Sequence, residues 1–247
     1  MSYKFSYKKN YSSSPYVNPV KKKRSFPISI TLFLVIINVL IFIIQVIWDY
    51  STQTPNSLGF FTSTFSLVPS YILQGKNLWT IMTSMFLHAN IWHILANMIS
   101  LFFVGSFLEK LIGKKKFFWL YLISGVVASL FFVFLASAFG SSELGARIFG
   151  SPNIPALGAS GAIFGLAATL MILAPKVKVY IMFIPIAMPL WLGMLIALFG
   201  LWLISSGFNL GIGNSAHFGG FIYGLIYGIY LRIKYRKKVQ VLDKIFR

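Results

Sequence analysis

The sequence predicts an all-α, polytopic membrane protein in which six transmembrane helices form one bundle. Of the 247 residues, 57% are hydrophobic and only 11% are charged, which is too apolar for a soluble domain of this size. Six apolar runs of near-bilayer length cover roughly residues 28–48, 90–108, 117–138, 160–174, 186–206 and 215–231. We therefore expect a membrane domain over 28–231, between basic tails over 1–27 and 232–247 that we expect to be disordered.

The Lys and Arg residues are distributed unevenly about these six runs. Of 22, all but Lys76 and Arg147 fall on one side of the predicted membrane. The positive-inside rule then places both termini in the cytoplasm and predicts a multi-pass protein of the cell membrane. The net charge of +18 is thus explained by topology, and we expect a lipid bilayer and no nucleic acid as partner.

The first run, residues 28–48, follows the basic tail without a small-residue cleavage site, so we expect a retained anchor and no cleaved signal peptide. Residues 49–89 connect it to the second run. This connection is long yet carries many Phe, Leu and Ile residues, so we expect it to lie in the membrane interface.

The second run carries His93 and Asn97 near its outer end. The two residues are four apart and share one helix face. Both can donate hydrogen bonds, and donors aimed at a developing alkoxide form an oxyanion hole, which the backbone N–H of Ser160 can join. The alternative is a polar pair that binds a neighbouring helix. His88 lies on another face, and we expect it in a loop.

The fourth run is short and begins at Gly158-Ala-Ser160-Gly161, after a connection rich in Gly, Ser and Pro. Residues 160–174 span about 22 Å of helix against a hydrocarbon core of about 30 Å. We therefore expect Ser160 below the outer surface, at the floor of a water-filled depression. A Gly-x-Ser-Gly turn can present a serine oxygen as a nucleophile. Alternatively, these small residues serve only helix packing.

The sixth run places His217 near its outer end, beside a stripe of small residues at Ala216, Gly220, Gly224 and Gly228. Gly161 and Gly165 have the same spacing on the fourth run, so the two helices can approach closely enough for Ser160 and His217 to hydrogen-bond. A histidine in a span can simply bind a neighbouring helix, but an ionisable residue there is a functional candidate.

No acidic residue completes a triad in this arrangement. The four acidic residues, Asp49, Glu109, Glu143 and Asp243, all lie outside the three motifs, so we do not expect a Ser-His-Asp arrangement. Phe164 follows Ser160 by one turn and can stack on the imidazole of His217, or it can be an ordinary packing residue.

These motifs resemble the rhomboid family of intramembrane serine proteases, over essentially all six runs. The matching segments are Gly158-Ala-Ser160-Gly161, Ala216-His217-x-x-Gly220, His93-x-x-x-Asn97 and Gly105-x-x-x-Glu109-x-x-x-Gly113. The resemblance implies that Ser160 is the nucleophile and His217 the general base, with His93 and Asn97 at the oxyanion. It further implies that transmembrane segments of membrane proteins are cut near their outer ends, without a metal or cofactor.

The chain departs from the family pattern at two positions. It has Trp79-Thr80 where the family often has Trp-Arg, and Phe164 where the family often has Tyr. The first departure affects how the first outer connection is anchored. The second retains an aromatic ring for stacking but loses a hydroxyl group.

Two other classes of protein stay open at this point. A catalytically inactive rhomboid-like protein would bind membrane proteins for quality control, but such proteins normally lack the serine or the histidine. A metalloprotease could use His88, His93 and His217, but the sequence has no His-Glu-x-x-His motif. The sequence predicts neither the particular substrate nor the oligomeric state.

Overall fold

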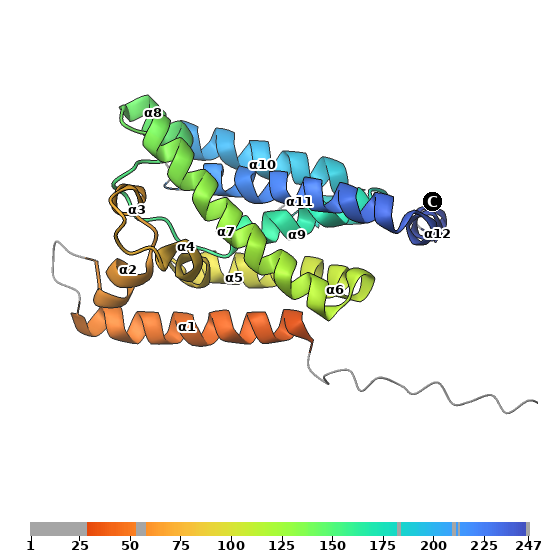
Figure 1. Ribbon diagram of the computed structural model, residues 1–247, viewed down its shortest axis with the longest axis horizontal. Coiled ribbons are helices and arrows are strands. Elements are labelled where there is room, and N and C mark those ends of the chain that lie inside the picture. Colours follow the sequence, from red (N-terminus) through yellow and green to blue (C-terminus); the bar gives the residue numbers. More distant parts are fainter. Residues whose placement is uncertain (1–28, 53–57, 182–183, 209–210, 212, 246–247) are drawn as a thin grey trace, which may run out of the picture.

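The computed structural model describes residues 29–52, 58–181, 184–208, 211 and 213–245 of the chain. These residues form a helical bundle, with α1 along one edge, α10 toward the opposite edge and α7 crossing between them (Figure 1). A two-stranded hairpin joins α9 to α10. The elements are α1 (Ile30–Thr52), α2 (Phe60–Phe65), α3 (Pro69–Leu73), α4 (Thr80–Thr83), the 3₁₀-helix η1 (Ser84–Phe86), α5 (Ile91–Ser100), the π-helix η2 (Leu101–Gly105), α6 (Ser106–Ile112), α7 (Lys114–Phe139), α8 (Glu143–Phe149), α9 (Ser160–Leu173), β1 (Lys178–Ile181), β2 (Ile184–Pro189), α10 (Leu190–Gly207), α11 (Asn214–Lys234) and α12 (Arg236–Ile245).

The helices confirm the predicted class of multi-pass, predominantly helical membrane protein. Among the described residues, four segments are long and apolar enough to cross a membrane, namely Ile30–Thr52, Ile91–Ile112, Lys114–Phe139 and Leu190–Gly207. Each of the six predicted runs overlaps a helix over most of its length. The count of six spans stays a prediction, because α9 has 14 residues and neither α9 nor α11 is among those four segments.

Helix α9 lies at the centre of the bundle and positions the site described below. Every residue from Gly161 to Leu170 is buried, so the helix has no exposed face over that stretch. It packs against α7 and α11, and Figure 1 shows it between other helices. Burial on all sides explains why its sequence is apolar all round and lacks an amphipathic pattern.

The carboxylate of Glu109 fastens α6 to the start of α1. It accepts hydrogen bonds from the backbone N–H groups of Ile30 and Thr31 at 3.0 and 2.8 Å, and from the hydroxyls of Ser29 and Thr31, both at 2.7 Å. The first N–H groups of a helix have no partner within the helix, so the carboxylate supplies one. Its negative charge also interacts favourably with the positive end of the helix dipole. Gly105 makes room, because a Cβ at this position would lie 2.9 Å from the Thr31 methyl group.

The connection between α1 and α5 is a folded layer that contains α2, α3, α4 and η1. Asp49 accepts hydrogen bonds from the N–H groups of Phe61 and Thr62 at the start of α2, at 2.8 and 3.1 Å. The indole of Trp79 donates to the Thr64 carbonyl at 3.1 Å. Thr80, at the position where the family often has Arg, is buried and bonds the Asn77 carbonyl at 2.7 Å. The location of this layer in the membrane interface stays a prediction.

The predicted start of the fifth run at residue 186 was wrong. Residues 184–189 form β2, which pairs antiparallel with β1, and α10 begins only at Leu190. Pro185 and Pro189 explain the difference, because a residue that precedes proline favours extended backbone over helix. The hairpin is a small addition to a predominantly helical chain.

The expectation of disorder in the C-terminal tail, 232–247, was also wrong over most of its length. Helix α11 continues to Lys234, and α12 follows and is seen nearly end-on in Figure 1. Val239 of α12 is only 4% exposed and packs into the main hydrophobic cluster, which gives the basic segment an apolar anchor. The basic tail predicted over residues 1–27 lies outside the described residues.

Candidate active site

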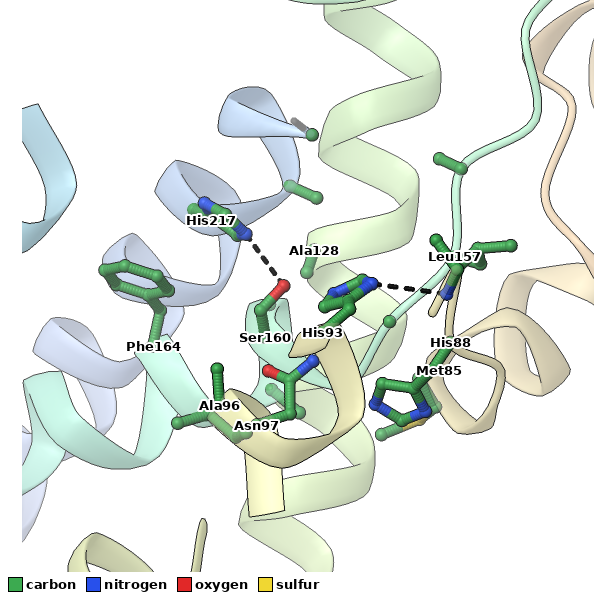
Figure 2. Close-up of a pocket in the computed structure, with 18 of the residues that line it drawn as sticks. Met85, His88, His93, Ala96, Asn97, Ala128, Leu157, Ser160, Phe164 and His217 are labelled. Carbon is green, nitrogen blue, oxygen red and sulfur yellow. Dashed lines mark hydrogen bonds between the residues drawn. The ribbon is translucent and has the colours of Figure 1, made fainter. Parts of the chain in front are cut away.

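Ser160 and His217 lie in direct contact at the ends of two adjacent helices. Ser160 is the first residue of α9, and its Oγ lies 2.7 Å from Nε2 of His217 in α11 (Figure 2). Ser160 is partly exposed, whereas His217 is only 6% exposed. A hydroxyl in hydrogen-bond contact with an imidazole nitrogen is the pairing from which a serine nucleophile is activated.

Close packing of the two helix backbones produces this contact. A Cβ at Gly220 would meet the carbonyl oxygen of Gly161, and a Cβ at Gly224 would meet the carbonyl oxygen of Gly165. Thr169 links the same helices, since its hydroxyl lies 3.0 Å from the Gly165 carbonyl and 2.9 Å from the Gly224 carbonyl. The two glycine stripes predicted from the sequence therefore do face each other.

The imidazole of His217 is oriented by an aromatic ring. Phe164 stacks on it with ring centroids 4.7 Å apart and an interplanar angle of 23°, which is the first of the two alternatives that the sequence left open for this residue. Nδ1 of His217 is buried and has no hydrogen-bond partner within the described part of the chain. Within these residues, therefore, no carboxylate holds His217.

His93 and Asn97 approach the chain just before Ser160. A Cβ at Gly158 would lie 2.8 Å from both Cε1 and Nε2 of His93, and 3.8 Å from Nδ2 of Asn97. Gly158 also has φ +127°, a backbone conformation that glycine adopts readily. In Figure 2 the side chains of His93 and Asn97 point toward Ser160. Glycine at this position therefore leaves the space that the His93 ring occupies, whereas Asn97 would be in no more than ordinary contact with a Cβ there.

The amide of Asn97 has an unused donor. The side chain is only 5% exposed, and Nδ2 makes no hydrogen bond to any described residue. Buried polar atoms normally have a partner, so an orphaned donor beside a candidate nucleophile indicates a place for a ligand oxygen. Whether this donor and His93 serve an oxyanion stays a prediction at this point.

These residues line one open cavity of about 2210 Å³. Its lining contains Ser160, His217, His93, Asn97 and Gly158, and extends to side chains of α1, α5, α7 and α10. Most of the lining residues are apolar. A depression at Ser160 agrees with the expectation drawn from the shortness of the fourth run. The cavity is larger than typical small-molecule pockets, which have volumes of about 300–1,000 Å³.

Two residues beside the site were not singled out for it from the sequence. His88 lies in a loop, as expected, but its ring is 1% exposed and meets the His93 ring edge-on at 5.2 Å between centroids. Burial, with a smaller contribution from nearby His93, lowers the pKa of His88 to about 3. The second residue is Gln45 of α1, which is buried and bonds the backbone of His88.

The spacing along the first run contains a signal for Gln45. Thr31, Asn38 and Gln45 are polar residues seven apart in an apolar run, a spacing that puts them on one helix face. All three are buried in the structure.

The three histidines do not form a metal centre. Within the described residues, no group of three His, Cys, Asp or Glu side chains is arranged to hold a metal ion. His88 and His93 are neighbours, whereas His217 is bonded to Ser160. The arrangement instead places the Ser160 hydroxyl against the His217 imidazole, with His93 and Asn97 nearby.

Comparison with known proteins adds independent information. A family model described as the Rhomboid domain matches residues 75–234. Rhomboid protein 1, mitochondrial, from Saccharomyces cerevisiae is 29% identical over 237 residues, which cover 93% of this chain and 62% of the yeast protein. Rhomboid protease AarA from Providencia stuartii is 31% identical, over 90% of this chain and 81% of its own length. Inactive RHOMBOID-like protein 8 from Arabidopsis thaliana is 34% identical over 79 residues, 32% of this chain and 22% of the plant protein.

Proposed function

The chain belongs to the rhomboid family, and we propose that it is an intramembrane serine endopeptidase that cleaves transmembrane segments near their outer ends. The observation that carries the proposal is the 2.7 Å contact between Ser160 Oγ and His217 Nε2 inside the open cavity. Relatives that carry the name of protease, such as the Providencia protein, support the same class of activity.

In the first step, Nε2 of His217 accepts the proton of the Ser160 hydroxyl as Oγ attacks a substrate carbonyl carbon. The imidazole needs a fixed orientation for this transfer, and the stack on Phe164 supplies it. A Ser-His dyad therefore suffices without a third, acidic group.

The attack turns the substrate carbonyl oxygen into an oxyanion. Nδ2 of Asn97, Nε2 of His93 and the backbone N–H of Ser160 are the donors assigned to it. Donors that are already in place stabilise this charge without reorganisation, and one such donor is worth roughly 100- to 1,000-fold in rate. Asn97 fits this role because its amide donor is buried near the serine and has no hydrogen-bond partner in the described part of the chain.

Collapse of the tetrahedral intermediate breaks the peptide C–N bond, and His217 returns its proton to the leaving amine. A water molecule then attacks the acyl-enzyme while His217 accepts a proton from that water. Collapse of this second intermediate breaks the bond between the acyl carbon and Ser160 Oγ, and His217 returns its proton to Oγ as the new carboxyl group is released. No step requires a metal or cofactor.

The substrate class follows from the size and lining of the cavity. An open, mostly apolar space of about 2210 Å³ suits a polypeptide segment better than a small molecule. A transmembrane helix hides its carbonyl groups in its own hydrogen bonds. We therefore expect preference for segments weakened by Gly, Pro or polar residues, with small side chains beside the scissile bond.

The proposed orientation places both termini in the cytoplasm of the cell and the active site toward the outer side. It is supported by the 20 Lys and Arg residues on one side against Lys76 and Arg147 on the other. Reporter fusions at Lys8 and Lys244 test it. A reporter found on the outer side of the membrane at either position contradicts it. Since one relative is mitochondrial, fractionation must also identify the membrane.

One alternative function has a specific observation in its favour, since one relative is named as inactive. A protein of that kind would bind transmembrane segments without cutting them. The presence of both Ser160 and His217 in hydrogen-bond contact favours the protease.

The experiment that tests the proposal measures fluorophosphonate labelling and cleavage of a transmembrane substrate by the full-length protein in detergent. Ser160→Ala and His217→Ala are expected to abolish cleavage while the protein stays folded, and Ser160→Ala is expected to abolish labelling. Ser63→Ala is the matched control, because that hydroxyl is exposed and, among the residues that the structure describes, bonds the Phe60 carbonyl alone. Cleavage by Ser160→Ala at the wild-type rate contradicts the proposal, and inhibition by a chelator alone favours a metalloprotease.

A further inference from the structure

The side chain of Gln45 in α1 forms hydrogen bonds with both backbone groups of His88. His88 lies in the loop just before α5, at the far end of the connection that begins after α1. Oε1 of Gln45 accepts a hydrogen bond from the His88 N–H, and its Nε2 donates to the His88 carbonyl, both at 3.1 Å. Because an N–H needs an acceptor and a carbonyl needs a donor, this pair of bonds permits only one orientation of the amide. Nε2 also donates to the Thr62 hydroxyl at 2.9 Å, and the side chain is only 5% exposed.

The backbone held by Gln45 leads directly to His93. The N–H of Ala89, the next residue, donates to Nδ1 of His93 at 3.4 Å. Asn90 follows and caps α5, with its side-chain oxygen accepting from the N–H of His93 at 2.9 Å. Three consecutive residues therefore connect Gln45 to both the ring and the backbone of His93.

The hydrogen bond from Ala89 determines which nitrogen of His93 carries the proton. A neutral imidazole has one donor and one acceptor nitrogen, and the partner of one nitrogen sets the state of the other. Since Nδ1 accepts from Ala89, the proton resides on Nε2. The Cε1–Nε2 edge is also the edge that lies against Gly158, two residues before Ser160. The donor nitrogen is thus directed to the side where the oxyanion forms.

We propose that Gln45 is a positioning residue of the oxyanion site, which holds His93 in the tautomer that donates from Nε2. Gln45 touches no reacting atom and acts through the backbone of His88 and Ala89. Without this support the ring is free to turn and to adopt the other tautomer, which presents a lone pair to the oxyanion and repels it. The inference rests on the proposed function for its kinetic consequence but not for the tautomer itself.

The tautomer can be observed directly, because the chain has only three histidines. The full chain is labelled with ¹⁵N-histidine, and its ring nitrogens are recorded in detergent micelles at a pH where His93 is neutral. The wild type is expected to show an unprotonated Nδ1 and a protonated Nε2 for His93. Gln45→Leu is expected to move both resonances toward values averaged between the tautomers. A wild-type spectrum with the proton on Nδ1, or an unchanged spectrum in Gln45→Leu, overturns the inference.

A matched control separates this effect from a general loss of stability. Asn38→Leu also removes a buried amide from α1, seven residues earlier, but Asn38 donates to the Leu34 carbonyl of its own helix. We expect Asn38→Leu to leave the His93 resonances in place. If both variants shift these resonances equally, the change reports loosening of α1, and the inference fails.

The kinetic test is a double-mutant cycle with cleavage of a transmembrane substrate. Gln45→Leu is expected to lower kcat by about 10- to 100-fold with KM nearly unchanged, because small displacements of a catalytic group have effects up to about that size. In the His93→Ala background, the same substitution is expected to change kcat by less than about twofold, because residues that act through one another are not additive. Additive losses in the cycle overturn the inference.

The two proposals fail in different ways. Wild-type protein that shows no Ser160-dependent cleavage contradicts the proposed function, while the NMR comparison still tests the tautomer. Active wild-type protein with additive losses retains the proposed function and contradicts only the role of Gln45.

Discussion

Gly220 of α11 and Gly161 of α9 are in backbone contact, so that a Cβ on Gly220 would meet the Gly161 carbonyl oxygen. The carbonyl belongs to the residue that follows Ser160, and Gly220 lies one turn after His217. The separation of the two helices at this point therefore sets the distance between Ser160 Oγ and His217 Nε2.

Gly220→Val should push the two helices apart, because a backbone carbonyl cannot move aside as a flexible side chain can. A displacement of about 1 Å at the dyad can cost about 100-fold in rate. We expect cleavage and fluorophosphonate labelling to fall together by about that factor. The variant should still insert in the membrane, since valine is apolar and each helix satisfies its own backbone.

The matched control is Gly200→Val in α10, where an added Cβ meets nothing within 4 Å. Its labelling should equal that of the wild type. If folded Gly220→Val protein labels and cleaves at the wild-type rate, the glycines do not position the dyad. If stability falls while labelling of the folded fraction stays normal, their role is packing alone.

Asn97→Ala should separate catalysis from stability. Loss of one oxyanion donor is expected to lower kcat by about 100- to 1,000-fold with little change in KM. Because Nδ2 of Asn97 is buried without a partner among the described residues, its removal relieves an unsatisfied group, and we expect little loss of thermal stability. Steady-state kinetics and thermal unfolding in the same detergent measure both. A large drop in unfolding temperature with unchanged kcat of the folded protein would instead assign Asn97 to helix packing.

Glu109→Gln should destabilise the docking of α1. The carboxylate accepts four hydrogen bonds at the start of that helix, and bonds to a charged group are worth about 1.5–3 kcal/mol each. An amide retains one acceptor oxygen and no charge, so we expect a loss of thermal stability of several degrees or more, with the dyad intact.

Glu143→Gln is the control for the loss of a carboxylate. Glu143 pairs with Arg147 at 2.6 Å on the surface, with 83% of the glutamate side chain exposed, and such pairs contribute about 0.3–0.5 kcal/mol. Equal losses of thermal stability in the two variants would show that Glu109 has no special role in docking α1.

His88 should contribute to the pH dependence of stability. Its pKa of about 3 in the folded protein lies below the ordinary 6.5, so between these values the unfolded chain binds more protons than the folded chain. Stability from this group is therefore complete above about pH 6.5 and falls as the pH is lowered, by up to about 1.4 kcal/mol per pH unit.

His88→Leu is expected to flatten the decline in unfolding free energy between pH 7 and pH 4.5, measured by chemical unfolding in micelles. His93 faces His88 and also titrates, so the comparison is repeated in a His93→Gln background. An identical slope in wild type and His88→Leu would contradict a buried, neutral His88.

Much of the architecture could be predicted because a membrane helix is recognised from the apolar composition of one continuous stretch of sequence. A helix that spans a bilayer needs about 20 consecutive apolar residues, so apolar runs of that length locate the helices. Residues four apart, such as His93 and Asn97 or Gly220 and Gly224, lie on the same helix face. Prediction failed where local signals were weaker. Proline pairs produced a hairpin at the fifth run, and Val239 anchored a basic segment that otherwise looked unstructured.

The sequence alone was sufficient for the six long apolar runs, their order, the family resemblance, and the candidate residues Ser160, His217, His93 and Asn97. The packed structure was needed to find that Gln45, in a different helix and 48 residues before His93, connects to that ring through the backbone of His88 and Ala89. A helix face can be read from spacing because its period is a local property of the backbone. A hydrogen bond between distant segments depends on how all the intervening helices pack, and no local pattern encodes that packing.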